Sequence, residues 1–315
     1  MDTQQPLPQT QIEAIRYFED PDNCHNFMVS RRWPNGVTCP RCGSQSIGKL
    51  SKPRYVWNCK GCKKQFTVKV GTVFEDSPLP LTKWLPAVWL IVNAKNGISS
   101  CEIARALGVT QKTAWFMAHR IRTALHAGSF EKLSGTIEAD ETFIGGKASN
   151  MHKSKREAKI QGRGTVGKAI VLGLLERDEK GKASKVKAKV IPDTQRETLH
   201  AEISQHVETG SQVFTDAWKA YRDLSPAYAH QFVDHAVAYV QGNVSTNGLE
   251  NFWCLLKRSV KGTYVSVEPY HLFRYLDEQA YRFNDRKGSD SDRFVKAMQS
   301  LAGKRLTYAE LTKDE

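Results

Sequence analysis

The sequence predicts an α/β protein in which a mixed β-sheet is flanked by helices and preceded by two small modules. Three observations support this prediction. Four cysteines fall in two pairs within residues 31–75, apolar residues recur with helical spacing in 76–130, and strand-like and helix-like segments alternate in 131–290. The flanking residues 1–30 and 291–315 are interpreted as a helical lead-in and a C-terminal tail. With 315 residues, of which 40% are hydrophobic, the chain is long enough for about two domains with apolar cores.

The charge of the chain indicates a polyanionic partner. Its 46 Lys and Arg outnumber 33 Asp and Glu, which gives a formal net charge of +13, and residues 31–69 hold ten of these cations and no acid. Nucleic acid is the first candidate for such a protein. The longest apolar run, residues 85–92, is far shorter than the roughly 20 residues of a membrane helix. Since the first twenty residues do not read as a signal peptide, we expect a cytoplasmic, nucleoid-associated protein with no membrane partner.

The first module, residues 31–75, is predicted to be a zinc ribbon. Cys39 and Cys42 form one C-x2-C pair, sixteen residues follow, and Cys59 and Cys62 form a second pair. Two such pairs offer four thiolates to one tetrahedral Zn²⁺ with a structural role. Two disulfides or a redox-active pair are the alternatives, and disulfides are rare in a cytosolic protein. The three remaining cysteines are interpreted as small buried residues: Cys24, Cys101 and Cys254.

The second module, residues 76–130, is predicted to contain a helix-turn-helix. After a first apolar helix, a serine-capped helix ends at Gly108, and Thr110 caps the helix that follows. An ordinary pair of packed helices is the alternative, because such patterns also occur by chance. If the second helix reads DNA, it presents three residues to a groove or to phosphates: Gln111, Lys112 and His119.

From residue 135 the pattern changes from helical to extended. Strands are predicted at 136–144, 166–175, 185–191, 212–216 and 228–234, and helices at 194–208, from 217 onward and at 247–257. This order is that of a ribonuclease-H-like fold, a mixed sheet with helices on its faces. In such a sheet the first strand lies beside the fourth.

Three carboxylates in this region are candidate catalytic residues and metal ligands. Asp140 lies midway along the first strand, Asp216 ends the fourth, and Glu250 lies on the last helix. Converging acids repel one another unless cations lie between them, and oxygen ligands suit Mg²⁺ or Mn²⁺. Two such ions activate a water or a 3′-hydroxyl and stabilise the leaving oxygen of a phosphodiester. Each acid also has a structural interpretation: Asp140 as a solvent-facing neighbour of Glu138 and Glu141, Asp216 as a helix cap, and Glu250 as part of a capping box.

Basic residues near these acids are predicted to bind DNA. Lys257 follows Glu250 by seven residues, so both lie on one helix face, where the amine is placed to hold a phosphate. Arg258 beside it is a further candidate. The basic stretch 147–168 is predicted to be a loop that contacts DNA, with a solvated hairpin as the alternative.

On these residues the chain resembles bacterial insertion-sequence transposases of the ISXO-type group, which join an N-terminal zinc ribbon to a DDE catalytic domain. The resemblance extends from about residue 20 to residue 308. It depends on the two cysteine pairs and on three motifs: Glu138-Ala-Asp140-Glu-Thr-Phe, Thr215-Asp216-x4-Tyr221 and Thr246-Asn-Gly-Leu-Glu250-Asn-Phe-Trp-Cys-Leu-Leu-Lys257-Arg.

The resemblance implies a transposase that cuts double-stranded DNA at the terminal inverted repeats of its own element. It would then transfer the 3′-OH ends into target DNA, acting as a homodimer or a higher oligomer. Asp140, Asp216 and Glu250 would be its metal ligands, with Lys257 near the scissile phosphate. Many relatives have His where this chain has Ser245. A catalytically silent DNA-binding protein is therefore the alternative, and a structure-specific nuclease is a further one.

Overall fold

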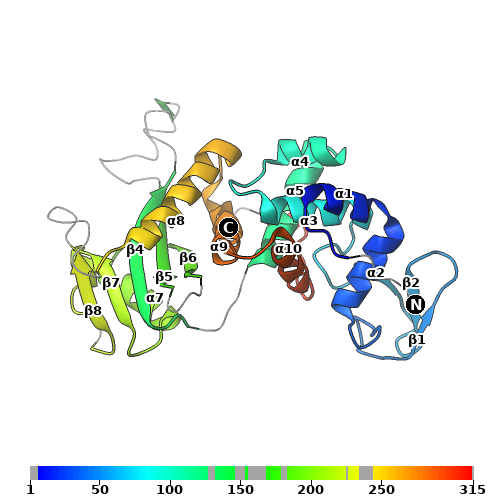
Figure 1. Cartoon of the computed structure of the whole chain (residues 1–315), viewed down its shortest axis with the longest axis horizontal. Coiled ribbons are helices and arrows are strands. Elements are labelled where there is room, and N and C mark those ends of the chain that lie inside the picture. The colour runs from blue at the N-terminus through cyan, green and yellow to red at the C-terminus, as the bar shows by residue number, and fades with distance from the viewer. Residues whose placement is uncertain are drawn as a thin grey trace. The chain divides into compact units, whose positions relative to one another are not determined.

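The structure is a computed structural model that describes residues 6–126, 132–145, 153–154, 168–178, 183–224, 226–233 and 244–313. It divides into two compact units (Figure 1). The first unit joins residues 1–126 to residues 288–315, and the second unit comprises residues 127–287. No helix among the described residues is long and apolar enough to cross a membrane.

The first unit begins with two helices and a three-stranded antiparallel sheet. These elements are α1 (Gln11–Glu19), α2 (Pro21–Arg32), β1 (Ile47–Lys49), β2 (Val56–Cys59) and β3 (Gln65–Thr67). Trp57 on β2 pairs with Phe66 on β3, and the two rings stack with centroids 5.7 Å apart. Trp33, just after α2, packs edge-on against both rings. This aromatic cluster is the small apolar core of the cysteine-rich module.

Three helices follow: α3 (Leu81–Asn93), α4 (Ser100–Leu107) and α5 (Gln111–Leu125). The last two are the helices that the sequence predicts on either side of Gly108. The Ser99 hydroxyl accepts a hydrogen bond from the Glu102 amide, and the Thr110 hydroxyl accepts one from the Thr113 amide. Gly108 ends α4 with φ +61°, a left-handed conformation in which glycine has no steric penalty.

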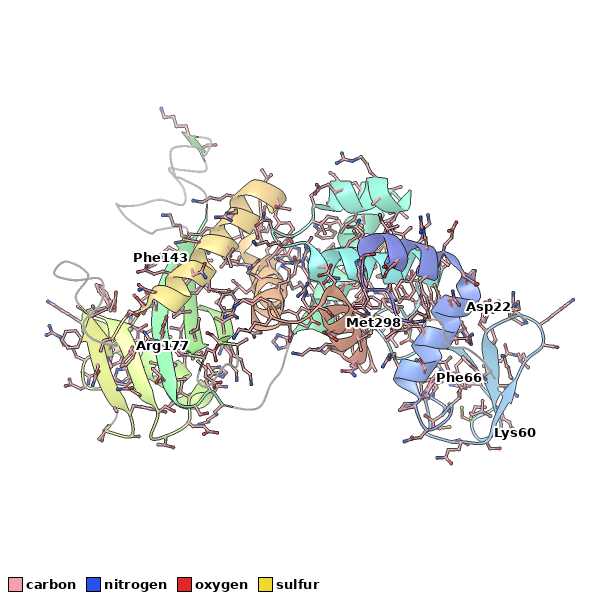
Figure 2. All side chains as sticks on the ribbon, viewed as in Figure 1. Asp22, Lys60, Phe66, Phe143, Arg177 and Met298 are labelled. Atoms are coloured by element: carbon pink, nitrogen blue, oxygen red, sulfur yellow. The ribbon has the colours of Figure 1, made fainter. Side chains whose placement is uncertain are left out.

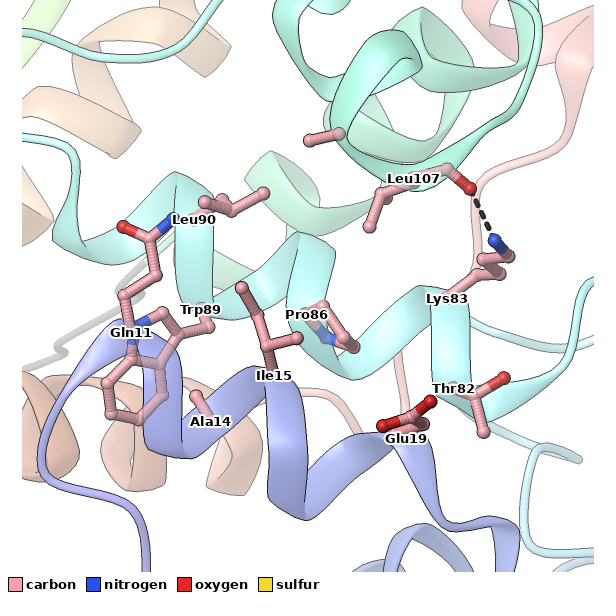
Figure 3. Close-up of a pocket in the computed structure, with 11 residues that line it drawn as sticks. Gln11, Ala14, Ile15, Glu19, Thr82, Lys83, Pro86, Trp89, Leu90 and Leu107 are labelled. Atoms are coloured by element: carbon pink, nitrogen blue, oxygen red, sulfur yellow. Dashed lines mark hydrogen bonds between the residues drawn. The ribbon is translucent and has the colours of Figure 1, made fainter.

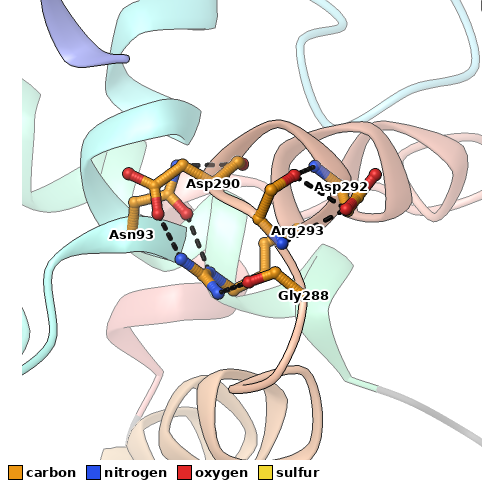
Figure 4. Close-up of polar contacts among 6 residues, drawn as sticks. Asn93, Gly288, Asp290, Asp292 and Arg293 are labelled. Atoms are coloured by element: carbon orange, nitrogen blue, oxygen red, sulfur yellow. Dashed lines mark hydrogen bonds and ion pairs between the residues drawn. The ribbon is translucent and has the colours of Figure 1, made fainter. Parts of the chain in front are cut away.

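The chain returns to the first unit through α10 (Asp290–Gln299) and α11 (Tyr308–Thr312). The ring of Phe294 on α10 lies 5.2 Å from the rings of Phe18 and Trp89, measured between centroids. Arg293 donates to Asn93 Oδ1 at 2.9 Å and to the carbonyl of Gly288 at 2.6 Å (Figure 4). The segment that the sequence analysis treats as a tail thus packs in the core of this unit.

The second unit contains a five-stranded mixed sheet in the order β6-β5-β4-β7-β8. Its elements are β4 (Thr136–Ile144), β5 (Ala169–Glu176), β6 (Lys185–Ile191), α7 (Arg196–His206), β7 (Gln212–Asp216), the 3₁₀ helix η2 (Lys219–Tyr221), β8 (Ala229–Val233), α8 (Asn247–Arg258), the π-helix η3 (Ser259–Tyr264), the 3₁₀ helix η4 (Pro269–His271) and α9 (Leu272–Asn284). The strands β4, β5 and β6 are antiparallel neighbours, whereas β7 runs parallel to both β4 and β8. The predicted α/β fold class is confirmed.

Each face of this sheet is covered by different helices. Ile137 and Ala139 of β4 face a core that includes Leu199 and Ile203 of α7. The opposite face packs against α8 and α9, whose core residues include Phe252. In Figure 1, α8 crosses the sheet in front of β4. Successive side chains of β4 therefore point to opposite faces of the sheet, and helices cover both faces, as expected for a central strand.

One predicted element is shorter than expected. The helix predicted to begin at residue 217 is a single 3₁₀ turn, η2. Its growth is prevented by Asp223, which adopts φ +55°, and by Pro226, which cannot donate a helical hydrogen bond. The prediction of an α-helix at this position is therefore wrong.

Candidate zinc site and candidate active site

The four paired cysteines form one cluster. Their Sγ atoms all lie within 4.8 Å of one another, with 3.7 Å between Cys39 and Cys62 and 3.6 Å between Cys42 and Cys59. A tetrahedral Zn²⁺ with Zn–S bonds of about 2.3 Å requires S···S distances of about 3.8 Å. The cluster therefore fits one structural zinc ion. None of the four is in a disulfide.

The backbone favours the thiolate form at this cluster. The amide of Cys62 donates to Cys59 Sγ at 3.5 Å and makes the largest contribution to lowering the pKa of Cys59 to about 6. Although the Ser44 amide acts in the opposite direction, the neighbouring thiols raise the pKa of Cys42 to about 11. Zinc binds thiolates, so the knuckle is prepared for the metal. Of the three other cysteines only Cys24 is buried. The interpretation of Cys101 and Cys254 as buried residues is wrong, because both lie on the solvent-facing sides of their helices.

Two of the three residues assigned to DNA reading are accessible. Gln111 and Lys112 are exposed in the first turn of α5. The side-chain amide of Gln111 donates to Ser100 Oγ at 2.8 Å, and Lys112 Nζ lies 5.0 Å from the ring centre of Tyr308. His119 is fully buried, because α5 is enclosed by the first unit from residue 117 to residue 122. The assignment of His119 to a DNA-facing surface is therefore wrong.

The sheet brings two of the candidate carboxylates side by side. In the parallel ladder of β4 and β7, Glu138 pairs with Phe214. Asp140 lies two residues after Glu138, and Asp216 lies two residues after Phe214. Their side chains therefore point to the same face of the sheet from neighbouring strands. Asp216 Oδ1 also accepts a hydrogen bond from the amide of Trp218 at 3.0 Å. This bond fixes the carboxylate at the end of β7.

Asp140 has the electrostatic properties of a crowded acidic site. Burial raises its pKa to about 6, and the negative charges of Asp216 and Glu250 add to the increase. The indole of Trp253 on α8 opposes it by donating to Asp140 Oδ2 at 2.8 Å. Glu250 itself is exposed in the first turn of α8. The charges of Asp216 and Glu250 therefore both act on Asp140.

The carboxylates are nevertheless not drawn into a closed ligand cluster. Across the described part of the chain, the four cysteines form the one group of three or more Cys, His, Asp or Glu side chains that converge on a single point. Oxygen donors of this kind fit Mg²⁺ or Mn²⁺, and a divalent cation would relieve the repulsion that acts on Asp140. The donor set therefore fits such a metal, and its side chains would have to move closer to bind it.

A glycine on β5 allows α8 to approach Asp140. Gly173 is the cross-strand partner of Asp140. A Cβ at this position would lie 2.5 Å from Trp253 Cζ2 and 2.8 Å from Leu249 Cδ2. Only a residue without a side chain leaves room for the indole that donates to Asp140. Sequence reasoning missed Trp253 and Gly173, although a glycine inside an apolar strand indicates a close approach of this kind.

Glu138 holds the beginning of α8. It is 3% exposed and accepts hydrogen bonds from Arg177 Nε at 2.7 Å and from the Leu249 amide at 2.9 Å. Arg177, labelled in Figure 2, also donates to the carbonyl and the hydroxyl of Ser245, both at 2.7 Å. Gly248 is close-packed here, since its Cβ would lie 2.9 Å from Glu138 Oε2. Sequence reasoning considered Glu138 only as a possible solvent-facing residue and did not identify Arg177.

A second buried carboxylate faces the opposite side of the sheet. Burial raises the pKa of Glu141 to about 7, and the negative charges of Asp140 and Asp216 contribute to the increase. The Tyr221 hydroxyl lowers this pKa. Tyr221 is fully buried, and burial raises its own pKa. The Tyr221 hydroxyl and the Glu141 carboxylate therefore face each other in the buried layer beneath Asp140 and Asp216.

The other basic candidates lie around α8. Lys257 is half-buried and Arg258 is exposed in the last turn of α8. The basic stretch 147–168 lies outside the described residues except for 153, 154 and 168. A cavity of about 340 Å³ lies in the first unit between α1, α3 and α4, where Lys83 donates to the Leu107 carbonyl (Figure 3). It contains none of the candidate residues.

Two protein families match the chain. Residues 132–284 match the family described as the ISXO2-like transposase domain, and residues 19–65 match the transposase zinc-ribbon domain. The first match includes Asp140, Asp216 and Glu250, and the second includes all four paired cysteines.

Two relatives are similar to the chain over most of their own length. One is an uncharacterized protein in transposable element ISH50 of Halobacterium salinarum, 29% identical over 255 residues, which are 78% of this chain and 84% of that protein. The other is an uncharacterized transposase-like protein of Haemophilus influenzae, 30% identical over 102 residues, which are 32% of this chain and 82% of that protein.

Proposed function

This chain belongs to the family of ISXO2-like transposases, and from that membership we propose a specific reaction. It cuts double-stranded DNA at the terminal inverted repeats of its element and transfers the 3′-OH ends into target DNA. The observation that carries the proposal is the placement of Asp140 beside Asp216 on parallel strands, with α8 bonded to Asp140 through Trp253. Phosphodiester chemistry on such carboxylate sets is assisted by metal ions.

Asp140, Asp216 and Glu250 would hold Mg²⁺ or Mn²⁺ in this proposal. When bound, the metal supplies activation of a water or 3′-hydroxyl and stabilises the leaving oxygen. The chain contributes orientation: Trp253 fixes one oxygen of Asp140, and Glu138 fixes the turn of α8 that carries Glu250.

DNA binding is assigned to basic and polar residues of both units. Lys257 and Arg258 would hold phosphates next to the carboxylates. The ten cations of residues 31–69 would bind phosphates at another part of the DNA. Gln111 and Lys112 would contact the repeats from the first turn of α5. Because two element ends are joined together, we propose that a dimer or a higher oligomer forms on DNA.

A cleavage and joining assay tests the proposal. The substrates are duplexes that carry the inverted repeats flanking the coding sequence, with Mg²⁺ or Mn²⁺ added. Asp216→Asn removes the charge and keeps an acceptor for the Trp218 amide, so we expect it to fold and to lose both cleavage and joining. Asp223→Asn, at an exposed acid in the same segment, should keep both.

The outcomes also separate the alternatives. Tight repeat binding by the wild type without cleavage would contradict the enzymatic proposal and leave the catalytically silent DNA-binding protein. Cleavage without joining would favour the structure-specific nuclease. Ser245, the position that raises the first alternative, accepts hydrogen bonds from Arg177 and so helps to hold α8.

A further inference from the structure

Trp218 differs from every other tryptophan of the chain. All seven tryptophans lie in described residues, and six of them are buried or half-buried. Trp218 is 52% exposed. A large part of its surface is therefore open to solvent, and an indole presents the largest flat apolar surface of any side chain.

The backbone of Trp218 is fixed on both sides while its indole is exposed. The amide donates to Asp216 Oδ1 at 3.0 Å, and the carbonyl accepts from the Tyr221 amide at 3.1 Å. Tyr221 is 1% exposed and anchors this turn in the core. Because consecutive Cα atoms are about 3.8 Å apart, the Cα of Trp218 lies within about 7.6 Å of that of Asp216.

The same segment carries two exposed cations, between Asp216 and Asp223 in the sequence. Lys219 and Arg222 are exposed, and neither forms an ion pair with another residue that the structure describes. An aromatic ring with interleaved cations is the arrangement by which proteins hold unpaired nucleotides, since bases stack on the ring and phosphates pair with the cations. The exposed ring and the two exposed cations of this turn are thus complementary to the bases and phosphates of a DNA strand.

We propose that Trp218 is a stacking platform for one unpaired base of the DNA strand that is cut at Asp216. The inference rests on the proposed function, because it is the reaction at Asp216 that brings the strand here. Lys219 and Arg222 hold the flanking phosphates. The platform captures a base once the duplex opens at the element boundary, and so it positions the scissile phosphate next to the carboxylates.

Phe232 provides a matched control. It is 55% exposed and pairs with Thr215, the residue before Asp216. The Thr215 hydroxyl contacts His230 Nε2 at 3.0 Å, so the side chains of Thr215, His230 and Phe232 share one face of the sheet. Asp216 points to the other face. Phe232→Ala therefore removes an equally exposed ring at the same end of the sheet, from the face opposite to the Asp216 side chain.

The experiment compares binding of two probes by the full-length chain with Ca²⁺ in place of Mg²⁺. One probe is a fully paired duplex of the flanking inverted repeat, and the other carries mismatches at the element boundary. We expect the wild type to prefer the mismatched probe. Trp218→Ala should weaken binding of that probe by about 5- to 150-fold, which corresponds to about 1–3 kcal/mol for one stacked base. Trp218→Phe should keep most of the affinity, and Phe232→Ala all of it.

The results distinguish the two proposals. Equal binding of the mismatched probe by wild type and Trp218→Ala, with cleavage by the wild type in Mg²⁺, overturns the stacking proposal alone. An equal loss in Phe232→Ala overturns it as well, because the effect would not depend on the face of the sheet. Wild-type binding no tighter to repeat DNA than to a scrambled duplex overturns the proposed function and the stacking proposal together.

Discussion

Two glycines decide how closely α8 approaches the sheet of the second unit. Gly173 lies beneath Trp253, and Gly248 lies against the carboxylate of Glu138. A side chain at either position would occupy space already filled by a ring or by a charged group. The hydrogen bond from Trp253 to Asp140 therefore depends on a residue that makes no polar contact itself.

Gly173→Ala should destabilise the second unit by about 1–3 kcal/mol, the usual cost of overpacking a core. The new methyl group would displace the indole and weaken its bond to Asp140, so cleavage should fall as well. Urea unfolding and the cleavage assay measure the two effects. Gly262→Ala is the control, because a Cβ there meets nothing within 4 Å. Equal stability of both variants would contradict the packing argument.

His25 on α2 makes the first unit sensitive to acid. It packs against the rings of Tyr55 and Trp57, at centroid distances of 4.5 and 5.1 Å. Burial lowers its pKa to about 4 from an ordinary value of 6.5, and the charge of Lys49 contributes. Between these two values the unfolded chain binds more protons, so stability should fall as the pH drops from 6.5 towards 4.

The loss attributable to His25 at pH 5.5 is at most about 1.4 kcal/mol. His25→Phe keeps the stacked ring and cannot titrate, which separates this effect from acid release of zinc. Thermal unfolding of both proteins at pH 7.5 and 5.5 is the measurement. We expect the wild type to lose more stability than the variant, and equal losses would show that His25 does not titrate in this range.

At the scale of elements, α8 is placed by its first turn. Glu138 accepts the Leu249 amide at the N-terminus of α8 and pairs with Arg177, whose side chain is 24% exposed. A carboxylate at a helix N-terminus stabilises the helix through its free amides and its dipole. The position of Glu250 on α8 thus depends on a buried pair outside the candidate metal ligands.

Glu138→Gln should cost about 1.5–3 kcal/mol, the range for hydrogen bonds to charged groups. Glutamine keeps the shape and one acceptor oxygen but leaves the guanidinium without its counter-charge. Asp223→Asn is the comparison, since its pair with Arg196 is exposed and should contribute less than about 1 kcal/mol. Chemical denaturation of both variants tests this, and a similar small loss in each would mean that the buried pair contributes no more than the exposed one.

The sequence predicted these elements better than their contacts. Alternation along residues 136–144 and the order of the segments were sufficient to predict the mixed sheet, and the cysteine spacing was sufficient to predict the zinc ribbon. Glu138 and Asp140 lie on the same face of β4. The local sequence pattern could not show that Glu138 binds the first turn of α8 while Asp140 lies near the other candidate carboxylates. That difference depends on Arg177 and Trp253, which are distant in sequence.

At the scale of the whole molecule, the first unit is built from two separate stretches of the chain. Phe294 contacts Phe18, Phe27 and Trp89, so the core of this unit contains residues from both stretches. An amphipathic pattern in 290–299 identifies a helix but not its distant partner. The sequence pattern alone therefore predicts only a C-terminal tail for residues 291–315.

Phe294→Ala should destabilise the first unit by about 3–5 kcal/mol, the usual cost of truncating a buried aromatic residue. Urea unfolding of the full-length chain measures the loss of stability. Limited proteolysis, followed by mapping of cuts within the N-terminal 126 residues, shows whether the first unit opens. Phe273→Ala removes a ring that is 45% exposed in the second unit and should change stability by less than about 0.5 kcal/mol. If the two variants behaved alike, α10 would not be part of this core.

The return of α10 to the first unit has a consequence for the order of events on the ribosome. Synthesis proceeds from the N-terminus, and domains generally fold as they emerge. Residues 127–287 are therefore complete before Phe294 has been made, whereas the surface around Trp89 stays uncovered until α10 has been synthesised. A ribosome that stops before residue 290 releases a polypeptide whose first unit lacks α10, so the apolar surface around Trp89 remains exposed to proteases.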